Sequence, residues 1–548
     1  MLLQQKFAES LIKELAGDKA VSALVGVFSK ILANHLTLGE NNEPVLASSF
    51  GSLAKIFSFI ATPQADRVQG GLQVDNKKFD AAVKAAAEKN GLGSDTTPPE
   101  DITPPEDITP PEDITPPVVS INPAPTGNGD MVSSYDLQQR FTSGYDSDYN
   151  YTNDKRIDAL LAGTMWGKGT GQGVELTYSF PGSNGSSSLW QQDYGRGEPF
   201  NQFYSFNALQ QEGTRNSLDQ WSEIANIHFT EVAETPDAVG DLRFAFSGEV
   251  TGNTLGWAHL PNLHQYSYSG QTMTGYTVSE ASGDVWLNRD SYSDKDWLAG
   301  SKNYHTLAHE VGHALGLKHT FDADGNGTVL NGNQDSYKYS IMSYTDHQNM
   351  GYQYTDVGPN SYSWSSLAPS SPMLYDVLAI QHLYGANFET RTGDDVYTFS
   401  SDAPFLYTIW DAGGTDSLDA SNQSLGAKLN LNQGTHSSIG IKYDSYKTPV
   451  AAVDNLAIAF GVQIENAIGS AFDDIFIGNS LDNIFTGNGG SDKATGGGGT
   501  NTFIFDGDYA DYTISGSANH ALVTNDHDKI ILNGIQNLQF DDYLHTLV

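Results

Sequence analysis

The sequence contains no cysteine. No thiolate can therefore act as a nucleophile or a zinc ligand, and no disulfide can rigidify the chain outside the cell. An extracellular protein without disulfides needs another source of rigidity, and bound calcium is a common one. The sequence also lacks an apolar run of about 18 residues, so we expect no stable membrane insertion.

Basic residues are scarce, because 28 Lys and Arg stand against 66 Asp and Glu, which gives a formal net charge of −38. A surface this acidic repels nucleic acids and anionic membranes, so we expect no nucleic-acid partner. The charge suits a protein that collects cations. It equally suits an exported protein that only has to stay soluble, and composition leaves both interpretations open.

The first 117 residues predict two parts. Residues 1–95 show helical periodicity in four stretches, which predicts a small N-terminal α domain. The stretches are 2–15, 19–38, 44–60 and 77–89. Residues 96–117 repeat the hexapeptide Thr-Pro-Pro-Glu-Asp-Ile, a Pro-rich linker that favours an extended, self-repelling spacer. The N-terminus lacks the layout of a signal peptide, so we expect export by another route.

Residues 118–388 have a mixed composition that predicts an α+β domain. Its expected strands are 174–180, 226–232 and 242–246, and its expected helices are 217–225, 302–317 and 372–384. Residues 389–548 instead alternate short β-prone runs with Gly, Asn and Asp. The whole chain is therefore expected to be multidomain.

A nine-residue period runs through part of this last region. Each block has Gly at its first position, Asp or Asn at its sixth and an apolar residue at its eighth. The first positions are Gly469, Gly478, Gly487 and Gly496. The sixth positions are Asp474, Asn483, Asp492 and Asn501, and the eighth are Phe476, Phe485, Ala494 and Phe503. Such a period predicts a C-terminal all-β parallel β-roll.

The segment HEVGHALGLKH, from His309 to His319, carries the strongest chemical signal. Residues four apart on a helix share a face, so His309 and His313 can direct two imidazoles at one zinc ion. Glu310 can act as general base on a zinc-bound water. Gly316 can end the helix in a left-handed conformation, after which His319 can complete the ligand set. A structural zinc site or an inactive relic is the alternative, but it gives Glu310 no reason to be there.

The sequence downstream, YSIMSY, is similar to the Met-turn of the metzincins, in which a methionine, here Met342, forms an apolar floor below the zinc. From around Ser133 to the C-terminus, the chain resembles the serralysin family of bacterial secreted metalloproteases. The further similar stretches are 221–232, 375–387 and 390–394. The resemblance implies a metzincin (zincin-like) fold for the protease domain.

The same resemblance implies the roles of further residues. It makes Tyr344 a switchable zinc ligand that helps stabilise the tetrahedral intermediate, as a phenol can. It places an extended substrate along an edge strand, for which Gly256, Trp257 and Ala258 are the candidates. It also implies broad specificity for protein or peptide substrates, a type I secretion apparatus and a proteinaceous inhibitor as partners, and a monomer outside the cell.

The C-terminal region resembles the family's RTX roll, in which turn residues bind calcium. The candidate ligands before the repeats are Arg391, Gly393, Asp395, Asp411, Gly413, Gly414, Asp416 and Glu465. Those within the repeats are Gly469, Asp474, Gly478, Asn483, Gly487 and Asp492. Asn at two sixth positions and missing turn glycines at Ala471 and Phe472 predict fewer or weaker sites. Residues 322–328 resemble the start of an EF-hand, but Asn333 stands at the twelfth position, so we favour an ordinary acidic turn.

Residues 1–95 are the largest departure from the family, whose propeptides are short. They could form a prodomain of a zymogen, a foldase or an adhesion module, and the sequence favours none of these. Residues 540–548 are acidic and then apolar, and they are similar to the family's uncleaved type I export signal.

We therefore expect a secreted zinc metalloendopeptidase whose C-terminal domain is stabilised by calcium. A hypothesis from another class is a non-catalytic, calcium-dependent adhesin that binds through residues 1–95 and keeps the zinc fold as a relic. A closer alternative is another metzincin, such as a matrixin. Such a protein would have the three histidines but neither the calcium roll nor an equivalent of Tyr344.

Overall fold

The computed structural model describes most of the chain beyond residue 140 and two short segments before it. The described residues are 36–38, 44–46, 141–143, 147–182, 194–234, 239–261, 263–269, 272–278, 281–292, 297–347, 349, 351–358, 361–444 and 448–548. The chain divides into two compact units, Met1–Thr115 and Pro116–Val548. In the described part, no helix has the length and apolar character that crossing a membrane requires.

The first unit contains two described strands, β1 (Leu36–Leu38) and β2 (Pro44–Leu46), which pair antiparallel with Thr37 opposite Val45. The prediction of helix at these positions was wrong. Thr37 and Val45 are β-branched, and such residues favour extended backbone over helix. The rest of the predicted α domain, and the Pro-rich linker, lie outside the described residues.

The second unit begins with a mixed sheet in the order β7-β5-β8-β12-β9, in which β6 also pairs with β8. Its strands are β5 (Val174–Ser179), β6 (Tyr204–Ser205), β7 (Ile227–Glu231), β8 (Leu242–Phe246), β9 (Gly256–Ala258) and β12 (Val285–Leu287). The first four strands in this order are mutually parallel, whereas β9 runs antiparallel to β12 and ends the sheet. The predicted strands at 174–180, 226–232 and 242–246 are confirmed as β5, β7 and β8.

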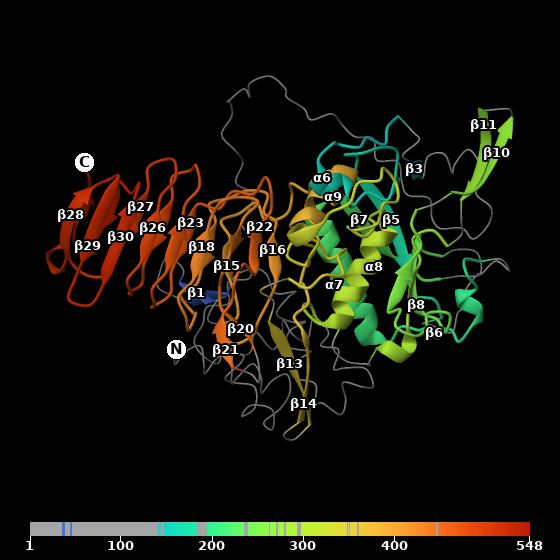
Figure 1. Cartoon of the computed structure of the whole chain (residues 1–548), viewed down its shortest axis with the longest axis horizontal. Coiled ribbons are helices and arrows are strands. Elements are labelled where there is room, and N and C mark those ends of the chain that lie inside the picture. The colour runs from blue at the N-terminus through green and yellow to red at the C-terminus, as the bar shows by residue number, and fades with distance from the viewer. Residues whose placement is uncertain are drawn as a thin grey trace. The chain divides into compact units, whose positions relative to one another are not determined.

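The described helices of this part are α6 (Lys155–Asp158), α7 (Ala208–Ile224), α8 (Lys302–Ala314) and α9 (Leu374–Tyr384). Helices α7 and α8 lie side by side (Figure 1). The three predicted helices are present, but their bounds differ from the prediction, most of all at the start of α7 and the end of α8. Helix α7 begins at Ala208 rather than at 217, because Asn207 and Gln210 form a capping box that starts it earlier. Helix α8 ends at Ala314 rather than at 317, because the backbone turns left-handed at Gly316.

Eight further strands pair in three small sheets, in the orders β3-β4, β10-β11 and β14-β13-β20-β21. Their strands are β3 (Phe141–Ser143), β4 (Thr164–Trp166), β10 (Leu263–Ser269), β11 (Thr272–Val278), β13 (Tyr352–Gly358), β14 (Ser361–Ser366), β20 (Ile441–Tyr443) and β21 (Pro449–Ala451).

Two long sheets form the C-terminal region, in the orders β15-β17-β23-β25-β27-β31-β32 and β18-β24-β26-β30-β29-β28. The first contains β15 (Val396–Thr398), β17 (Ser417–Asp419), β23 (Asn466–Ile468), β25 (Ile484–Thr486), β27 (Thr502–Ile504), β31 (Asn537–Gln539) and β32 (Leu544–Thr546). The second contains β18 (Lys428–Asn430), β24 (Ile475–Ile477), β26 (Lys493–Thr495), β28 (Thr513–Ser517), β29 (His520–Thr524) and β30 (Lys529–Asn533). A third, short sheet joins β16 (Tyr407–Ile409), β22 (Leu456–Ile458) and β19 (His436–Ser437).

The pairing register shows why the nine-residue period matters. Ala467 pairs with Phe485 and Phe485 with Phe503, whereas Phe476 of the intervening block pairs with Ala494 in the other sheet. Successive blocks therefore alternate between two parallel sheets, which fits the predicted β-roll, and the stacked strands are seen at the red end of the chain in Figure 1. The end of the roll corrects the prediction, because β28, β29 and β30 pair antiparallel, as do β31 and β32.

Two ion pairs connect the α/β part of the second unit to its roll. Arg391, just before the first roll strand, donates to Glu223 of α7 at 2.9 Å. Lys338, which precedes the Met-turn, donates to Asp454 between β21 and β22 at 2.7 Å. The site-bearing part and the roll are thus held together by charge as well as by packing.

Phe476 offers a test of the roll. Its side chain is fully buried and its ring centroid lies 5.4 Å from that of Phe485 and 5.8 Å from that of Phe503. Phe476→Ala should lower the free energy of unfolding by about 3–5 kcal/mol, measured by urea unfolding in saturating calcium. Ile475→Ala, which changes an exposed neighbour in the same strand, is the control. Equal losses in both variants would contradict the described orientation of β24.

Candidate active site

Helix α8 brings the first two histidines together. The hydroxyl of Ser301 caps the helix by accepting a hydrogen bond from the N–H of Tyr304 at 3.2 Å. His309 and His313 follow one turn apart, with ring centroids 4.8 Å from each other. The two rings and that of His319 each offer a nitrogen, and these nitrogens lie within 4.8 Å of one another. The structure thus brings together the three histidines that the sequence predicts as zinc ligands.

The third histidine reaches the site because the chain reverses at Gly316. The φ angle of Gly316 is +101°, and a β-carbon there would lie 2.3 Å from the carbonyl oxygen of Thr164. Both the left-handed backbone and the close approach exclude a side chain. The N–H of Leu317 then bonds the carbonyl of Gly312 at 2.9 Å, which closes the turn.

Each imidazole is oriented through its Nδ1 atom. The three pairs are His309 with the carbonyl of Ile341 at 2.7 Å, His313 with the carbonyl of Leu317 at 2.8 Å, and His319 with the carboxylate of Asp322 at 2.6 Å. These oxygens only accept hydrogen bonds, so each Nδ1 carries the proton and each Nε2 keeps its lone pair. Each accepting oxygen thereby fixes the tautomer that a metal requires.

The donor set fits a zinc ion. The Nε2 atom of His309 is buried, and no described group bonds to it. The Nε2 atoms of His313 and His319 lie 3.1 Å apart, an arrangement of two lone pairs that a shared cation relieves. Burial lowers the pKa of His313 to about 4 and that of His309 well below its usual value, so both rings are neutral ligands at pH 7. Three imidazoles with room for a further ligand are typical of catalytic zinc.

Met342, the predicted floor residue, packs against helix α8. Its side chain is fully buried, and its Sδ lies only 2.7 Å from where a β-carbon at Gly312 would be. Gly312 of the helix therefore makes room for the methionine. Asp376 has no signal in the sequence that marks it as part of the site, but its buried carboxylate accepts hydrogen bonds from the hydroxyl of Ser340 at 2.6 Å and from the N–H of Ile341 at 2.7 Å. Asp376 thus holds Ile341, the residue whose carbonyl orients His309.

Two aromatic rings flank the histidines on the solvent side. Tyr344 is 63% exposed, and its hydroxyl lies 2.7 Å from the Nε2 of His319. Phe321, which likewise has no such signal in the sequence, stacks on the ring of His319 at 5.0 Å with an interplanar angle of 3°. The ring of Phe321 lies 5.1 Å from that of Tyr344. The exposed phenol of Tyr344 therefore lies where it can contact either a metal or a bound substrate.

Glu310 lies beneath the edge strand β9. Burial raises the pKa of Glu310 to about 8, although the backbone N–H of Ala258 acts in the opposite direction. A β-carbon at Gly256 would lie 2.6 Å from a methyl carbon of Leu287 and 3.2 Å from the Cγ of Glu310. Gly256 is therefore needed for the strand to approach Glu310. Two of the predicted substrate-strand residues, Gly256 and Ala258, are thus neighbours of the predicted general base. The third, Trp257, donates its indole N–H to the buried carboxylate of Glu198.

A second cluster of possible metal ligands lies at the start of the roll. Carboxylate oxygens of Asp395, Asp411 and Asp416 lie within 4.8 Å of one another. The N–H of Asp416 bonds the carboxylate of Glu465 at 2.8 Å, and burial raises the pKa of Asp416 to about 6, helped by the nearby carboxylates. A β-carbon at Gly414 would lie 2.0 Å from the carbonyl oxygen of Gly393, so no side chain fits where these two turns approach each other. Mutual repulsion of these carboxylates suits a divalent cation.

The remaining predicted calcium ligands are arranged differently. The guanidinium of Arg391 faces Glu223, and the N–H of Gly413 bonds Asp411 at 2.8 Å. The carboxylate of Asp474 accepts from the N–H of Ala427 at 2.6 Å, and that of Asp492 from the N–H of Asp474 at 2.9 Å. The glycines at 469, 478 and 487 leave no room for a side chain beside their sixth-position partners. Among the described acidic residues, those of the repeats form no cluster like that of Asp395.

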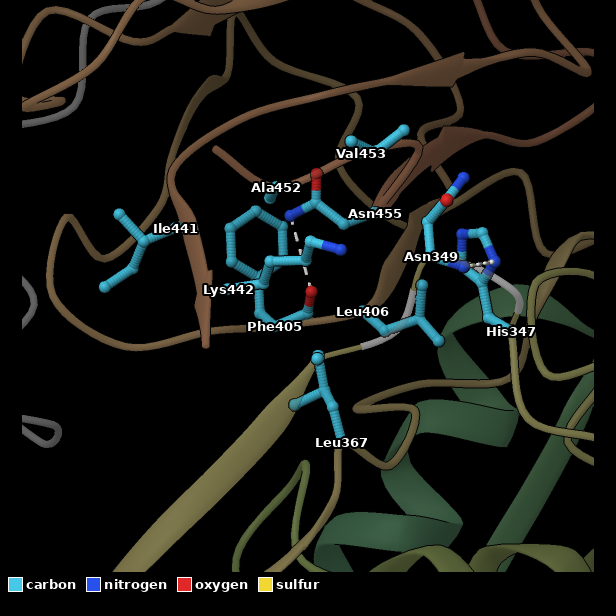
Figure 2. A pocket seen from close by; sticks show the side chains of 11 residues that line it. His347, Asn349, Leu367, Phe405, Leu406, Ile441, Lys442, Ala452, Val453 and Asn455 are labelled. Carbon is cyan, nitrogen blue, oxygen red and sulfur yellow. Dashed lines mark hydrogen bonds between the residues drawn. The ribbon is translucent and has the colours of Figure 1, made fainter. Parts of the chain in front are cut away.

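Asn483 and the EF-hand-like loop also lack a cluster of this kind in the described part. The amide of Asn483 donates to the carbonyl of Glu465 and to the side chain of Asn479, both at 3.0 Å. Asp322 directs its carboxylate to His319. The pocket drawn in Figure 2 is lined by His347, Asn349 and Leu367 from the α/β part and by Phe405, Leu406 and Asn455, among others, from the roll. Its lining includes none of the three histidines, so we assign it no part in the metal site.

Comparisons with known proteins agree with this arrangement. The family described as "Metallo-peptidase family M12" matches residues 205–354, and the family described as "Peptidase M10 serralysin C terminal" matches residues 379–546. The chain is 33% identical to Serralysin of Proteus mirabilis over 56% of this chain and 59% of that protein. It thus spans about three fifths of the length of this relative.

Two further relatives are covered more completely. The chain is 32% identical to Metalloprotease AprA of Pseudomonas entomophila (strain L48) over 63% of this chain and 69% of that protein. It is 30% identical to Serralysin G of Dickeya chrysanthemi over 64% of this chain and 70% of that protein. The matched regions include both the histidine site and the roll, and the chain therefore belongs to the serralysin family of metzincin metallopeptidases.

Proposed function

We propose that the chain is a secreted zinc metalloendopeptidase of broad specificity. One observation carries the proposal: three histidine nitrogens converge on the helix that carries the buried Glu310, next to β9, which no other strand than β12 pairs with among the described residues. A structural zinc site would need neither the buried carboxylate nor the edge. Membership of the serralysin family supports the same activity.

His309, His313 and His319 would hold a zinc ion, which would supply Lewis acidity toward the scissile carbonyl and toward water. Glu310 takes the proton of the attacking water and passes it to the leaving amine. Its place supports this role, because Glu310 directly follows His309 on α8 and its carboxylate is buried, away from bulk water. The phenol of Tyr344 leaves His319 and donates a hydrogen bond to the oxyanion.

Strand β9 holds the substrate. It is the last strand of its sheet in the described part of the chain, and a peptide can add to it through backbone hydrogen bonds. Recognition of this kind depends little on side chains, which supports broad specificity for protein or peptide substrates.

The remaining parts serve export and stability in this proposal. Residues 118–388 are the protease domain and 389–548 the calcium-binding roll with its type I export signal. Residues 1–95, joined through the linker at 96–117, form a separate module. Calcium held by Asp395, Asp411, Asp416 and their neighbours stabilises the roll once the protein reaches extracellular calcium.

Glu310→Gln tests the general base. The variant should bind zinc in a 1:1 ratio, because all three ligands remain, yet its kcat on casein should fall by about 10²–10⁴-fold. Zinc content by atomic absorption and casein hydrolysis give the two readouts, with chelator-treated wild type as the inactive reference. Full activity in the variant would remove Glu310 from the mechanism. An inactive wild type that still binds a partner through residues 1–95 would favour the adhesin hypothesis.

Tyr344→Phe tests the oxyanion role. Removing the hydroxyl should lower kcat by about 10²–10³-fold and change KM little, since the bond forms mainly in the transition state. Peptide cleavage by zinc-loaded protein is the measurement. Tyr543→Phe, which alters another exposed phenol, is the control and should behave as wild type. A variant that raises KM alone would mean that Tyr344 only binds substrate.

Asp416→Asn tests the calcium cluster. Calcium at a hundred times its Kd should stabilise the wild type by about 2.7 kcal/mol, seen as a rise in Tm, and the variant should lose most of this rise. Asp402→Asn in an exposed turn serves as the control, because its carboxylate only bonds Ser400 at 2.7 Å. An unchanged calcium response in Asp416→Asn would place the calcium elsewhere.

A further inference from the structure

Glu198 is a buried carboxylate that the mechanism above does not use. It begins the short 3-10 helix η1 (Glu198–Phe200), and its side chain has no solvent exposure. One oxygen, Oε1, accepts from the indole N–H of Trp257 and from the ring Nε2 of His259, both at 2.8 Å. The other accepts from the backbone N–H of Arg196 at 2.7 Å. A carboxylate buried this deeply persists only because its oxygens are satisfied.

The two side chains that Glu198 accepts from lie on either side of Ala258. Ala258 is the residue of β9 whose backbone N–H acts on Glu310. Trp257 and His259 thus anchor the strand immediately before and after this point. The anchor reaches β9 from a segment far away in the sequence, so it fixes the strand independently of its pairing with β12.

Strand β9 needs such an anchor. It is three residues long, it pairs only with β12 in the described part of the chain, and its other edge is open. Beyond it, the backbone of His259 continues the contact through an N–H bond to the carbonyl of Asp284 at 3.0 Å. The guanidinium of Arg196 lies 5.0 Å from the ring centroid of Trp257 and covers it.

We propose that Glu198 is a positioning residue. It fixes strand β9 in the position that both Glu310 and an extended peptide substrate require. The inference rests on the proposed peptidase function. Because the same strand contacts the general base and receives the substrate, loss of the anchor affects both kcat and KM. It leaves zinc binding intact, since no ligand of the metal is involved.

Glu198→Gln is the test, with Glu234→Gln as its matched control. Glu234 is also buried and accepts from the hydroxyl of Ser179 at 3.0 Å, but it does not contact β9 through any described hydrogen bond. Per mole of zinc-loaded protein, Glu198→Gln should lower kcat/KM on a fluorogenic peptide about tenfold, with kcat lower and KM higher. Glu234→Gln should lower Tm without changing either constant. Kinetic constants that match in the two variants would overturn the proposal.

Trp257→Phe provides a second, independent measurement, which applies even where Glu198→Gln fails to fold. It removes one of the two side-chain donors and keeps the ring, so kcat/KM should fall several-fold with zinc retained. Combined with Glu198→Gln it should add little, because both changes weaken the same anchor of β9. Multiplicative losses, or an unchanged Trp257→Phe variant, would overturn the anchor. A wild type without metal-dependent cleavage would instead overturn the proposed function itself.

Discussion

At Gly316 the backbone of the chain passes so close to the carbonyl of Thr164 that no side chain fits, and its φ of +101° is one that other residues resist. Everything in the metal site follows from this turn. It ends α8 directly after the second histidine, returns the chain along the helix and sets His319 opposite His313. The carbonyls exposed at the helix end do not remain free, because Trp166 and Tyr384 donate to those of Ala314 and Leu315 at 2.8 and 2.7 Å. The ligand geometry is thus built into the core.

The metal ligands were predictable because they are local in sequence, and a helix followed by one glycine turn brings His309, His313 and His319 together. The regular roll was predictable for a similar reason, since its period repeats. Features that depend on distant contacts were not. Asp376 lies in a helix and looks like any acidic residue until its carboxylate is seen under the Met-turn, and Phe321 is unremarkable until it stacks on His319. The early start of α7 required recognition of the Asn207–Gln210 cap, a signal that was present in the sequence.

The sixth positions of the roll alternate between Asp and Asn, and the two side chains differ in charge and in hydrogen-bonding capacity. Asp474 and Asp492 directly precede β24 and β26, which are neighbouring strands of one sheet. Burial raises the pKa of Asp492 to about 8, and Asp474 and other carboxylates add to the shift. Asn483 and Asn501 face the alternate side, where the N–H of Asn483 bonds the Asn501 side chain at 3.0 Å. An amide supplies donors of its own, so the Asn side is satisfied without a cation. The two sides of the roll therefore differ in charge although their backbone pairing repeats.

The roll ends in antiparallel strands, and this end has a consequence for how such a domain can change length over evolutionary time. Blocks of nine residues alternate between two sheets, so inserting one block would transfer every later strand to the opposite sheet and separate the terminal hairpins from the strands they cover. Inserting two blocks would return each strand to its own sheet and leave the closing hairpins in place. Growth and loss in this domain are therefore expected in steps of whole turns, with the terminal hairpins inherited as a fixed cap.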